Sequence, residues 1–354
     1  MSKTILIMAG GTGGHIMPGL AVAQELVAAG HTVEWLGGVA SSMEARLVPQ
    51  NGVPFHSVDF GGVRGKGVTT KLAFPVRLMK AIKQARAIIK QVKPDVVLGM
   101  GGYITVPGGF AAKSSGVPIV LHEQNSIAGM SNKVLAKIAK KVLTGFPNVF
   151  ANGTWVGNPV KAAIANLPNP KLRFAEREGV LKIAVVGGSL GAQALNTLVP
   201  QALALLPQES RPTVIHQAGE KMIADLKANY DEAGVDAQCV AFVQDMAALY
   251  ADVDVMICRA GAMTVSELAA AGVASIMVPF PFAVDDHQTA NAKLLTDAHA
   301  GVCIAQSQLT AQSLADELYA LTREKLLRQA IQARTVAKPN ATQDVAQACL
   351  NAAK

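Results

Sequence analysis

The sequence predicts an α/β protein made of two Rossmann-like, doubly wound parallel sheets, and three observations lead to this prediction. The chain of 354 residues is longer than one ordinary core needs and suits two domains of about 150–200 residues each. Short apolar runs alternate with helical stretches throughout, as in strand–helix repeats. A glycine-rich turn follows an apolar run once in each half, at residues 10–14 and 187–191.

The predicted strands are mostly apolar without alternation, which is typical of parallel strands covered by helices on both faces. In the first half they span residues 4–8, 32–36, 95–99, 117–121 and 141–144. In the second half they span residues 181–186, 213–217, 239–243, 254–258, 274–278 and 302–304.

The two halves also resemble each other. Residues 93–102 match residues 252–261 in pattern, and a helical stretch and a second apolar strand follow each of them. Two units in tandem account for this repeat. We therefore expect an N-terminal domain at 1–160, a C-terminal domain at 161–337, and a last helix at 338–354 that crosses back to the first domain.

The composition indicates a well-buried globular protein, because 50% of the residues are hydrophobic and only 16% are charged. The four cysteines form no CxxC pair, so we expect reduced core thiols rather than a disulfide or metal framework. No leader of basic and then apolar residues is visible at the amino end. The longest uncharged stretch, 268–284, is interrupted by Gly272, Pro279 and Pro281, so we expect a buried helix–strand segment there, not a membrane span.

The positive charge is concentrated in the first half. Residues 1–160 hold 16 Lys or Arg against 6 Asp or Glu, whereas residues 161–354 hold 16 against 19. Within 71–90, cations interleave with apolar residues, which favours an anionic membrane surface or a helix that packs one side into the core. Nucleic acid is not favoured, because no aromatic stacking platform accompanies the charge. The residues predicted to face the membrane are Lys71, Leu72, Phe74, Arg77, Leu78, Lys80, Ile82 and Lys83.

The first glycine-rich turn predicts a phosphate site, because backbone N–H groups at a helix start can approach an anion closely. A dinucleotide is not favoured, since the strand after it ends in Gly37-Gly38 rather than in an acid for a ribose hydroxyl. His15 ends the turn. The positive end of the helix disfavours a charged imidazole, so His15 is either a general base or a structural cap.

Polar residues follow several predicted strands, at the sheet edge where ligands bind. Residues 122–125 (His-Glu-Gln-Asn) favour the lip of a functional cleft, and residues 286–291 offer amides for sugar hydroxyls. Thr264 and Glu267 suit a diphosphate and a ribose, or alternatively a helix-capping pattern. The Asp-Val-Asp run at 252–254 lies at a strand entry, which favours a solvated end over a metal site.

Together these motifs resemble the MurG family of glycosyltransferases. The segments that carry the resemblance are GGTGGHIMPGLAVA (10–23), GMGGYITVPGG (99–109), LHEQNSIAGMSNK (121–133), VGNPV (156–160), VVGGSLGA (185–192) and CRAGAMTVSE (258–267). The resemblance implies a GT-B fold, with two Rossmann-like domains facing across a cleft. It also implies inverting transfer of GlcNAc from UDP-GlcNAc to the C4 hydroxyl of MurNAc in lipid I, which yields lipid II and UDP for peptidoglycan synthesis.

The same resemblance implies a peripheral enzyme on the cytoplasmic face of the bacterial inner membrane, with no cofactor or metal. His15 is the first choice as base, with Glu123 and His122 in reserve. The implied donor-site residues are Thr12, Gly13, Gly14, Asn125, Lys161, Ser189, Val243, Ala262, Met263, Thr264, Val265, Ser266, Glu267 and Gln288. The implied acceptor-diphosphate residues are Gly11, Thr12, Gly13, Gly14, Gly101, Gly102 and Tyr103.

One position departs from the family pattern. Lys161 stands where the family commonly has arginine, and lysine keeps the charge without the planar fork of a guanidinium. Two other functions remain open at this point: a soluble UDP-GlcNAc epimerase of the same architecture, and a non-catalytic module that binds a nucleotide or a membrane.

Overall fold

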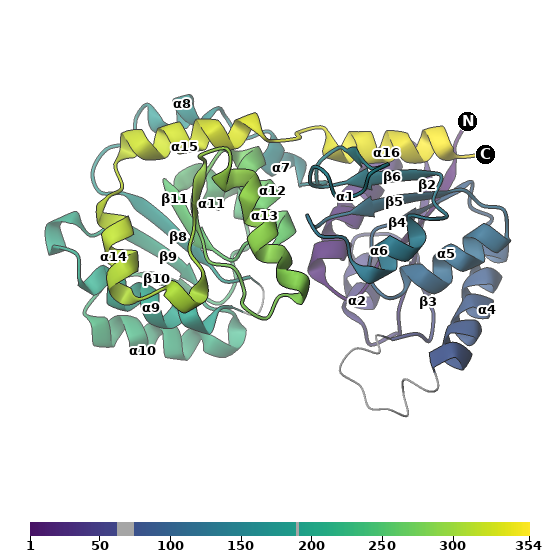
Figure 1. Cartoon of the computed structure of the whole chain (residues 1–354), viewed down its shortest axis with the longest axis horizontal. Coiled ribbons are helices and arrows are strands. Elements are labelled where there is room, and N and C mark those ends of the chain that lie inside the picture. The colour runs from purple at the N-terminus through teal and green to yellow at the C-terminus, as the bar shows by residue number, and fades with distance from the viewer. Residues whose placement is uncertain (62–73, 189–190) are drawn as a thin grey trace. The chain divides into compact units, whose positions relative to one another are not determined.

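The computed structural model describes residues 1–61, 74–188 and 191–354, which form two compact units (Figure 1). Unit 1 comprises Met1–Lys161 and Lys338–Lys354, and unit 2 comprises Ala162–Ala337. Three residues with predicted roles, Lys71, Leu72 and Ser189, lie outside the described part of the chain.

Unit 1 is built on a seven-stranded sheet in the order β3-β2-β1-β4-β5-β6-β7, and the strand pairs are parallel. Its strands are β1 (Thr4–Met8), β2 (Thr32–Gly37), β3 (Phe55–Ser57), β4 (Val96–Gly99), β5 (Ile119–Glu123), β6 (Lys141–Thr144) and β7 (Thr154–Trp155). Its helices are α1 (Gly13–Ala28), α2 (Met43–Gln50), α4 (Phe74–Val92), α5 (Thr105–Ser114), α6 (Met130–Leu135) and α16 (Ala341–Ala352).

Successive residues of β1 pack into two different cores, because side chains of a strand point alternately to the two faces of its sheet. Ile5 and Ile7 pack with residues of α1 and α16. Leu6 and Met8 pack with residues of α4 and α5. Helices therefore cover both faces of the sheet, as the doubly wound fold class predicts.

Unit 2 is built on a six-stranded parallel sheet in the order β10-β9-β8-β11-β12-β13. Its strands are β8 (Lys182–Val186), β9 (Thr213–Gln217), β10 (Gln238–Val240), β11 (Val255–Cys258), β12 (Ala274–Met277) and β13 (Gly301–Cys303). Its α-helices are α7 (Ala162–Ala165), α8 (Pro170–Phe174), α9 (Gln193–Ala204), α10 (Ile223–Ala233), α11 (Met246–Asp252), α12 (Ala262–Ala271), α13 (His287–Thr296), α14 (Ala311–Tyr319) and α15 (Arg323–Thr335). Over its described residues, unit 2 also has the short 3-10 helices η1 (Gln208–Ser210), η2 (Glu220–Met222), η3 (Val284–Asp286) and η4 (Gln306–Gln308).

The strand order reverses direction once in each sheet, between β1 and β4 in unit 1 and between β8 and β11 in unit 2. In an open parallel sheet, ligands bind beyond the carboxyl ends of the strands at such a reversal. The four segments that follow these strands are 9–14, 100–104, 187–192 and 259–264. The topology therefore puts one candidate ligand site in each unit.

The uncharged stretch at 268–284 forms the end of α12, the buried strand β12 and the loop after it, so the predicted helix–strand segment is confirmed. Over the described residues, we find no helix with the length and apolar character needed to cross a membrane.

The structure of helix α4 shows that part of the surface predicted to face the membrane is instead packed into the core. Leu78 and Ile82, one helical turn apart, are half-buried and pack with Phe74 against the core shared with α5. The large apolar side chains that α4 exposes are instead Val76 and Met79, at 74% and 57% exposure. One side of α4 thus packs into the core, while the other side is basic and partly apolar.

Candidate active site

In unit 1 the turns that follow β1 and β4 lie against each other. A Cβ atom on Gly102 would lie only 2.1 Å from the carbonyl oxygen of Gly10, so this contact requires glycine. Gly11 and Gly102 also have φ angles of 92° and 90°, which residues with side chains rarely adopt. The structure thus brings together residues 10–14 and 101–103, the two segments expected to bind the acceptor diphosphate.

His15 lies in the first turn of α1 and is half-buried. Its Nδ1 atom is 3.2 Å from the carbonyl oxygen of Gly10 and 3.2 Å from Oγ1 of Thr12. Because a carbonyl oxygen only accepts, the bond to Gly10 needs the proton on Nδ1 and leaves Nε2 as the basic nitrogen. The ring lies close to Gly101, where a Cβ atom would come within 3.0 Å of Nε2. This geometry suits a general base next to the second turn.

The reserve bases His122 and Glu123 are buried at the end of β5, with exposures of 0% and 1%. His122 donates from Nε2 to the Gly157 carbonyl oxygen at 2.9 Å and accepts at Nδ1 from the Gln124 amide at 3.0 Å. Burial lowers the pKa of His122 to about 4, although the Gly157 bond and the charge of Glu123 act in the opposite direction. His122 is therefore neutral at physiological pH with both nitrogens engaged.

The Glu123 carboxylate is also fully engaged. It accepts the backbone N–H groups of Asn125 and Gly129, each at 2.9 Å, and the Asn132 side-chain amide at 2.8 Å. These bonds hold the loop after β5, which carries the predicted donor residue Asn125. His122 and Glu123 thus both hold this loop through hydrogen bonds.

Glu44, which belongs to none of the predicted motifs, contacts the first glycine-rich turn and is wholly buried. It comes from α2, but its side chain reaches the backbone N–H of Gly38 at the end of β2, at 3.1 Å. A carboxylate therefore does lie where a dinucleotide site needs one, yet it is buried against backbone N–H groups instead of being exposed to a ribose. The one available signal is an acid shortly after the strand end at Gly37-Gly38, which is weak by itself.

In unit 2, residues 262–267 form the first turns of α12, which begins after Gly261 at the end of the β11 loop. The capping alternative for Thr264 is wrong, because the N-cap residue is Gly261 and Thr264 lies inside the helix. Glu267 accepts a hydrogen bond of 3.0 Å from the Tyr250 hydroxyl. Burial raises the pKa of Tyr250 well above its ordinary value, and the charge of Glu267 adds to this shift, so the phenol stays a donor.

The loop between β12 and α13 carries the predicted sugar-binding residue Gln288. The Oε1 atom of Gln288 accepts the backbone N–H of Phe280 at 2.8 Å. Just before it, Asp285 and Asp286 have φ angles of 54° and 51°, an uncommon conformation that accumulates at functional sites. Val243 is half-buried, after the end of β10.

The Asp-Val-Asp run at 252–254 forms ion pairs at the entry of β11. Asp254 is buried and lies 2.6 Å from Arg177 Nη1, so the expectation of a solvated strand end is wrong for this residue. Asp252 is half-exposed and pairs with Lys182 at 2.6 Å. Both carboxylates therefore have cationic side chains as partners. Among the residues described, we find no cluster of three or more His, Cys, Asp or Glu that could hold a metal.

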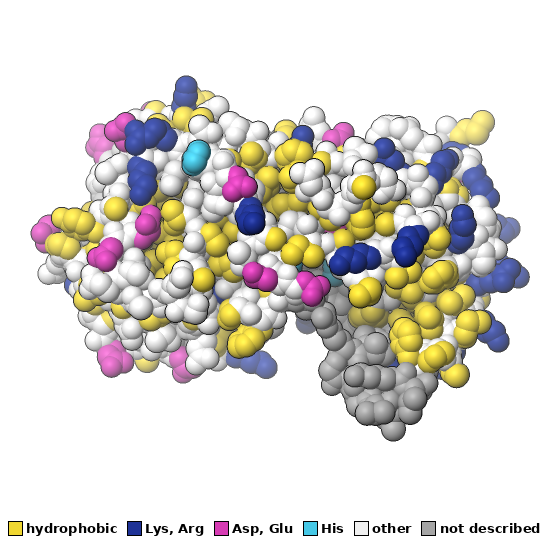
Figure 2. Space-filling model, viewed as in Figure 1, with side chains coloured by type: hydrophobic (Ala, Val, Ile, Leu, Met, Phe, Trp, Pro, Cys, Tyr) yellow, Lys and Arg dark blue, Asp and Glu magenta, His cyan; other side chains and the backbone are white. Residues whose placement is uncertain are grey.

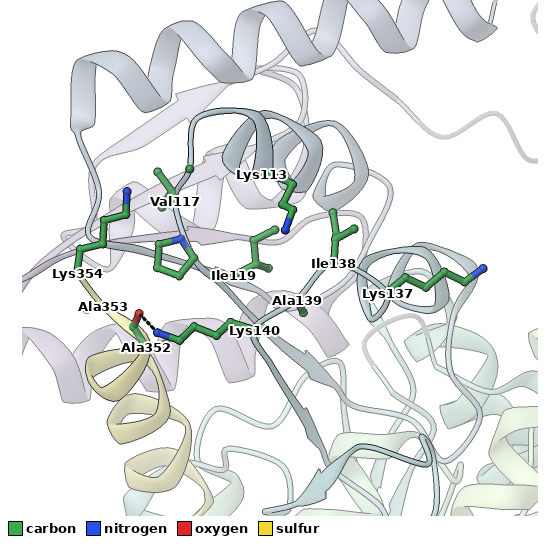
Figure 3. A pocket seen from close by; sticks show the side chains of 12 residues that line it. Lys113, Val117, Ile119, Lys137, Ile138, Ala139, Lys140, Ala352, Ala353 and Lys354 are labelled. Atoms are coloured by element: carbon green, nitrogen blue, oxygen red, sulfur yellow. Dashed lines mark hydrogen bonds between the residues drawn. The ribbon is translucent and has the colours of Figure 1, made fainter.

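A pocket of about 560 Å³ lies elsewhere in unit 1, around the amino end of β5 (Figure 3). Lys113, Lys137, Lys140 and Lys354 contribute to its lining around an apolar floor. Lys140 donates a hydrogen bond of 3.1 Å to the carbonyl oxygen of Ala352. Because ligands of parallel sheets bind at the carboxyl ends of the strands, this pocket is separate from the candidate site.

Two family models match the chain. The glycosyltransferase family 28 N-terminal domain matches residues 5–144, and the glycosyltransferase family 28 C-terminal domain matches residues 182–348.

The relatives that the chain resembles include proteins named UDP-N-acetylglucosamine--N-acetylmuramyl-(pentapeptide) pyrophosphoryl-undecaprenol N-acetylglucosamine transferase. The protein from Dechloromonas aromatica is 57% identical over 354 residues, which covers 100% of both chains. The protein from Ralstonia nicotianae is 56% identical over 357 residues, which covers 100% of this chain and 98% of the relative.

The chain is also similar to solved structures, among them a MurG and an epimerase. MurG of Acinetobacter baumannii has a TM-score of 0.86 and 42% identity, and the match covers 99% of each chain. A UDP-GlcNAc 2-epimerase from Neisseria meningitidis has a TM-score of 0.68 over 99% of this chain and 100% of the epimerase, at 9% identity. At that identity, the second likeness concerns the fold alone.

Proposed function

The chain belongs to glycosyltransferase family 28, and we propose that it transfers GlcNAc from UDP-GlcNAc to the C4 hydroxyl of MurNAc in lipid I. The products are lipid II, a precursor of peptidoglycan, and UDP. The observation that carries this proposal is the full-length identity of 57% and 56% to transferases named for this reaction. The epimerase alternative is not favoured, because its structural likeness comes with only 9% identity.

The reaction is a single displacement at the anomeric carbon of GlcNAc. The acceptor hydroxyl oxygen forms the new C–O bond while the bond to the β-phosphate oxygen of UDP breaks on the opposite face, so the configuration inverts. The hydroxyl proton passes to a base, and UDP leaves with the bonding electrons. The charge that develops on UDP needs stabilisation by N–H groups or a helix start.

We assign His15 as the base in this scheme. The Gly10 carbonyl favours the tautomer that carries its proton on Nδ1, so Nε2 accepts the proton from the acceptor hydroxyl. The neighbouring turns at 10–14 and 101–103 would receive the acceptor diphosphate. His122 and Glu123 then serve to position the loop that carries Asn125.

We assign the donor to unit 2. At the start of α12, the N–H groups of residues 262–264 would bind the diphosphate, because the N–H of Val265 already donates to the Gly261 carbonyl oxygen. Glu267, one turn later, accepts from the ribose hydroxyls. Tyr250 holds the Glu267 carboxylate from the protein side. Gln288 would bind the sugar through its side-chain amide nitrogen, because its oxygen already accepts from Phe280. Val243 would offer its backbone to the uracil.

We further propose that the enzyme works as a peripheral protein on the cytoplasmic face of the bacterial inner membrane, where a lipid-linked acceptor is accessible. Helix α4 supports this, because exposed Val76 and Met79 lie among exposed cations such as Lys83. Lys80 contributes less, since Asp59 pairs with it at 2.9 Å. In the view of Figure 2, Lys and Arg side chains gather over unit 1, while Asp and Glu lie mainly over unit 2.

The test is incubation of the purified protein with UDP-GlcNAc, with and without lipid I in detergent. We expect release of UDP and formation of lipid II only when lipid I is present. Formation of an epimer of UDP-GlcNAc without an acceptor would support the epimerase instead. Nucleotide binding without any turnover would support a binding module.

A further inference from the structure

Glu44 is a wholly buried carboxylate, with 0% exposure, in the first turn of α2. A buried carboxylate destabilises a fold unless donors or cations compensate for the lost water. Among the described residues, no ion pair involves Glu44. Its compensation therefore comes from hydrogen bonds, together with the positive end of its own helix.

Three hydrogen bonds join Glu44 to three segments at the carboxyl edge of the sheet. Its Oε2 atom accepts the backbone N–H of Gly11 at 3.3 Å, and Oε1 accepts that of Gly38 at 3.1 Å. The Tyr103 hydroxyl is the third donor, 3.4 Å from Oε1. These donors follow β1, β2 and β4, three adjacent strands, so one side chain connects all three strand ends.

The space around the carboxylate depends on glycines. A Cβ atom on Gly10 would lie 2.5 Å from Oε1 of Glu44, and one on Gly37 would lie 2.8 Å from its Cγ. A Cβ atom on Gly38 would lie 2.5 Å from the Tyr103 hydroxyl. The burial of Tyr103, with the nearby charge of Glu44, raises the pKa of its phenol to about 12, so Tyr103 remains a donor.

We propose that Glu44 is a positioning residue for the acceptor diphosphate. It turns the Gly11 N–H inward, away from the ligand side, and it fixes the ring of Tyr103 against the first turn. Gly11 then contributes its backbone conformation to the site and not its N–H group, which differs from the role expected from the sequence. The N–H groups at the start of α1, on Gly13 and Gly14, remain to meet the anion.

This inference rests on the proposed function, because it assigns the lipid-linked diphosphate to the turns that Glu44 supports. It predicts an effect on one substrate only. Loss of the carboxylate should raise the KM for lipid I, while the KM for UDP-GlcNAc should stay within about twofold. One lost hydrogen bond to a charged group corresponds to about a tenfold change.

The test compares Glu44→Gln with Asp95→Asn as a matched control. Asp95 also accepts a backbone N–H, that of Thr4 at 2.8 Å, but at the opposite end of β1. We expect E44Q to raise the KM for lipid I about tenfold or more at a nearly unchanged kcat. D95N should lower the thermal unfolding midpoint without changing the ratio of the two KM values.

Two outcomes would overturn the proposal. In one, E44Q leaves both KM values within about twofold of the wild type. In the other, E44Q behaves like D95N, with a lower unfolding midpoint and an unchanged ratio of KM values. If the wild-type protein forms no lipid II, the proposed function fails separately. Calorimetric binding of inorganic pyrophosphate to wild type and E44Q, with UDP present, then decides the role of Glu44: weaker binding to E44Q supports it, and equal binding refutes it.

Discussion

The Nε2 atom of His122 donates a hydrogen bond of 2.9 Å to the carbonyl oxygen of Gly157, 35 residues farther along the chain. The bond ties the end of β5 to residues 156–160, the segment that leads out of unit 1 towards unit 2. A protonated or absent imidazole at this point disturbs both segments at once.

Acidification should therefore destabilise unit 1. Burial lowers the pKa of His122 from 6.5 to about 4, so between these values the unfolded chain binds a proton that the folded chain does not. The free energy of unfolding should decrease as the pH falls through this range, by about 3 kcal/mol for the full shift. Both tryptophans, Trp35 and Trp155, lie in unit 1, so tryptophan fluorescence during urea unfolding at several pH values measures this directly.

His122→Phe should reduce this pH dependence. It should also lower the free energy of unfolding at pH 7 by about 1–3 kcal/mol, because the Gly157 carbonyl loses its donor. His31→Asn, at a half-buried histidine of the same unit, is the control and should keep the slope. An unchanged slope in H122F would assign the pH effect to other groups.

His15→Ala should lower kcat at least about a hundredfold, the low end for loss of a general base, while UDP-GlcNAc binding stays nearly intact. Steady-state transfer and calorimetric titration of the donor measure the two quantities. His31→Ala is the matched control, because His31 follows the other end of the same helix. Near-normal turnover of H15A would contradict the assignment of the base.

Glu267→Ala should raise the KM for UDP-GlcNAc about tenfold or more and leave the KM for lipid I within about twofold, since Glu267 is assigned to the ribose. Tyr250→Phe should give a smaller rise, because it removes only the hydroxyl that holds the carboxylate at 3.0 Å. Initial rates with each substrate varied in turn give both constants. A rise in the KM for lipid I alone would contradict the assignment of Glu267 to the donor site.

The double variant Arg77→Gln/Lys83→Gln should bind vesicles that contain anionic lipid about thirtyfold more weakly, since each cation near such a surface contributes about 1 kcal/mol. Vesicle sedimentation at low salt measures the binding, and higher salt should weaken it. Lys171→Gln/Lys221→Gln removes the same charge from exposed positions of unit 2. Equal losses in the two double variants would show that only the net charge matters.

Asp254→Asn should lower the free energy of unfolding by about 3–5 kcal/mol, because it leaves the partly buried guanidinium of Arg177 without its partner at 2.6 Å. Asp252→Asn should change it by less than about 1 kcal/mol, because that pair with Lys182 is half-exposed.

Transfer by the wild-type enzyme should continue in excess EDTA. If EDTA inhibits the wild type and D252N removes this sensitivity, residues 252–254 would bind a metal after all.

The meeting of the two turns in unit 1 was predictable from the sequence. Residues 10–14 and 101–103 each follow an apolar strand, and the carboxyl ends of parallel strands share one edge of the sheet. The two edge strands were not predictable. Strand β3 has only three residues and β7 only two, Thr154 and Trp155, and neither forms an apolar run. The local pattern is simply too short.

The side chains whose roles the sequence does not decide have neighbours that come from elsewhere in the chain. Glu44 is a single acid in a short helix, and its role depends on how α2 packs back over the ends of β1 and β2. His122 and Glu123 are polar residues at a strand end, which does not distinguish a ligand from a loop anchor. Leu78 and Ile82 did carry a signal, since their spacing of four places both on one helical face.

The position of α16 in unit 1 has a consequence for synthesis. All of unit 2, residues 162–337, is translated between the two parts of unit 1, so α16 is made last. The core of unit 1 is incomplete until residues of α16 such as Val345 and Cys349 are made, because they pack in the same core as Ile5 and Ile7. Its strands, though made first, thus stay incompletely covered for most of translation, and that interval is when they are most open to chaperones and to aggregation.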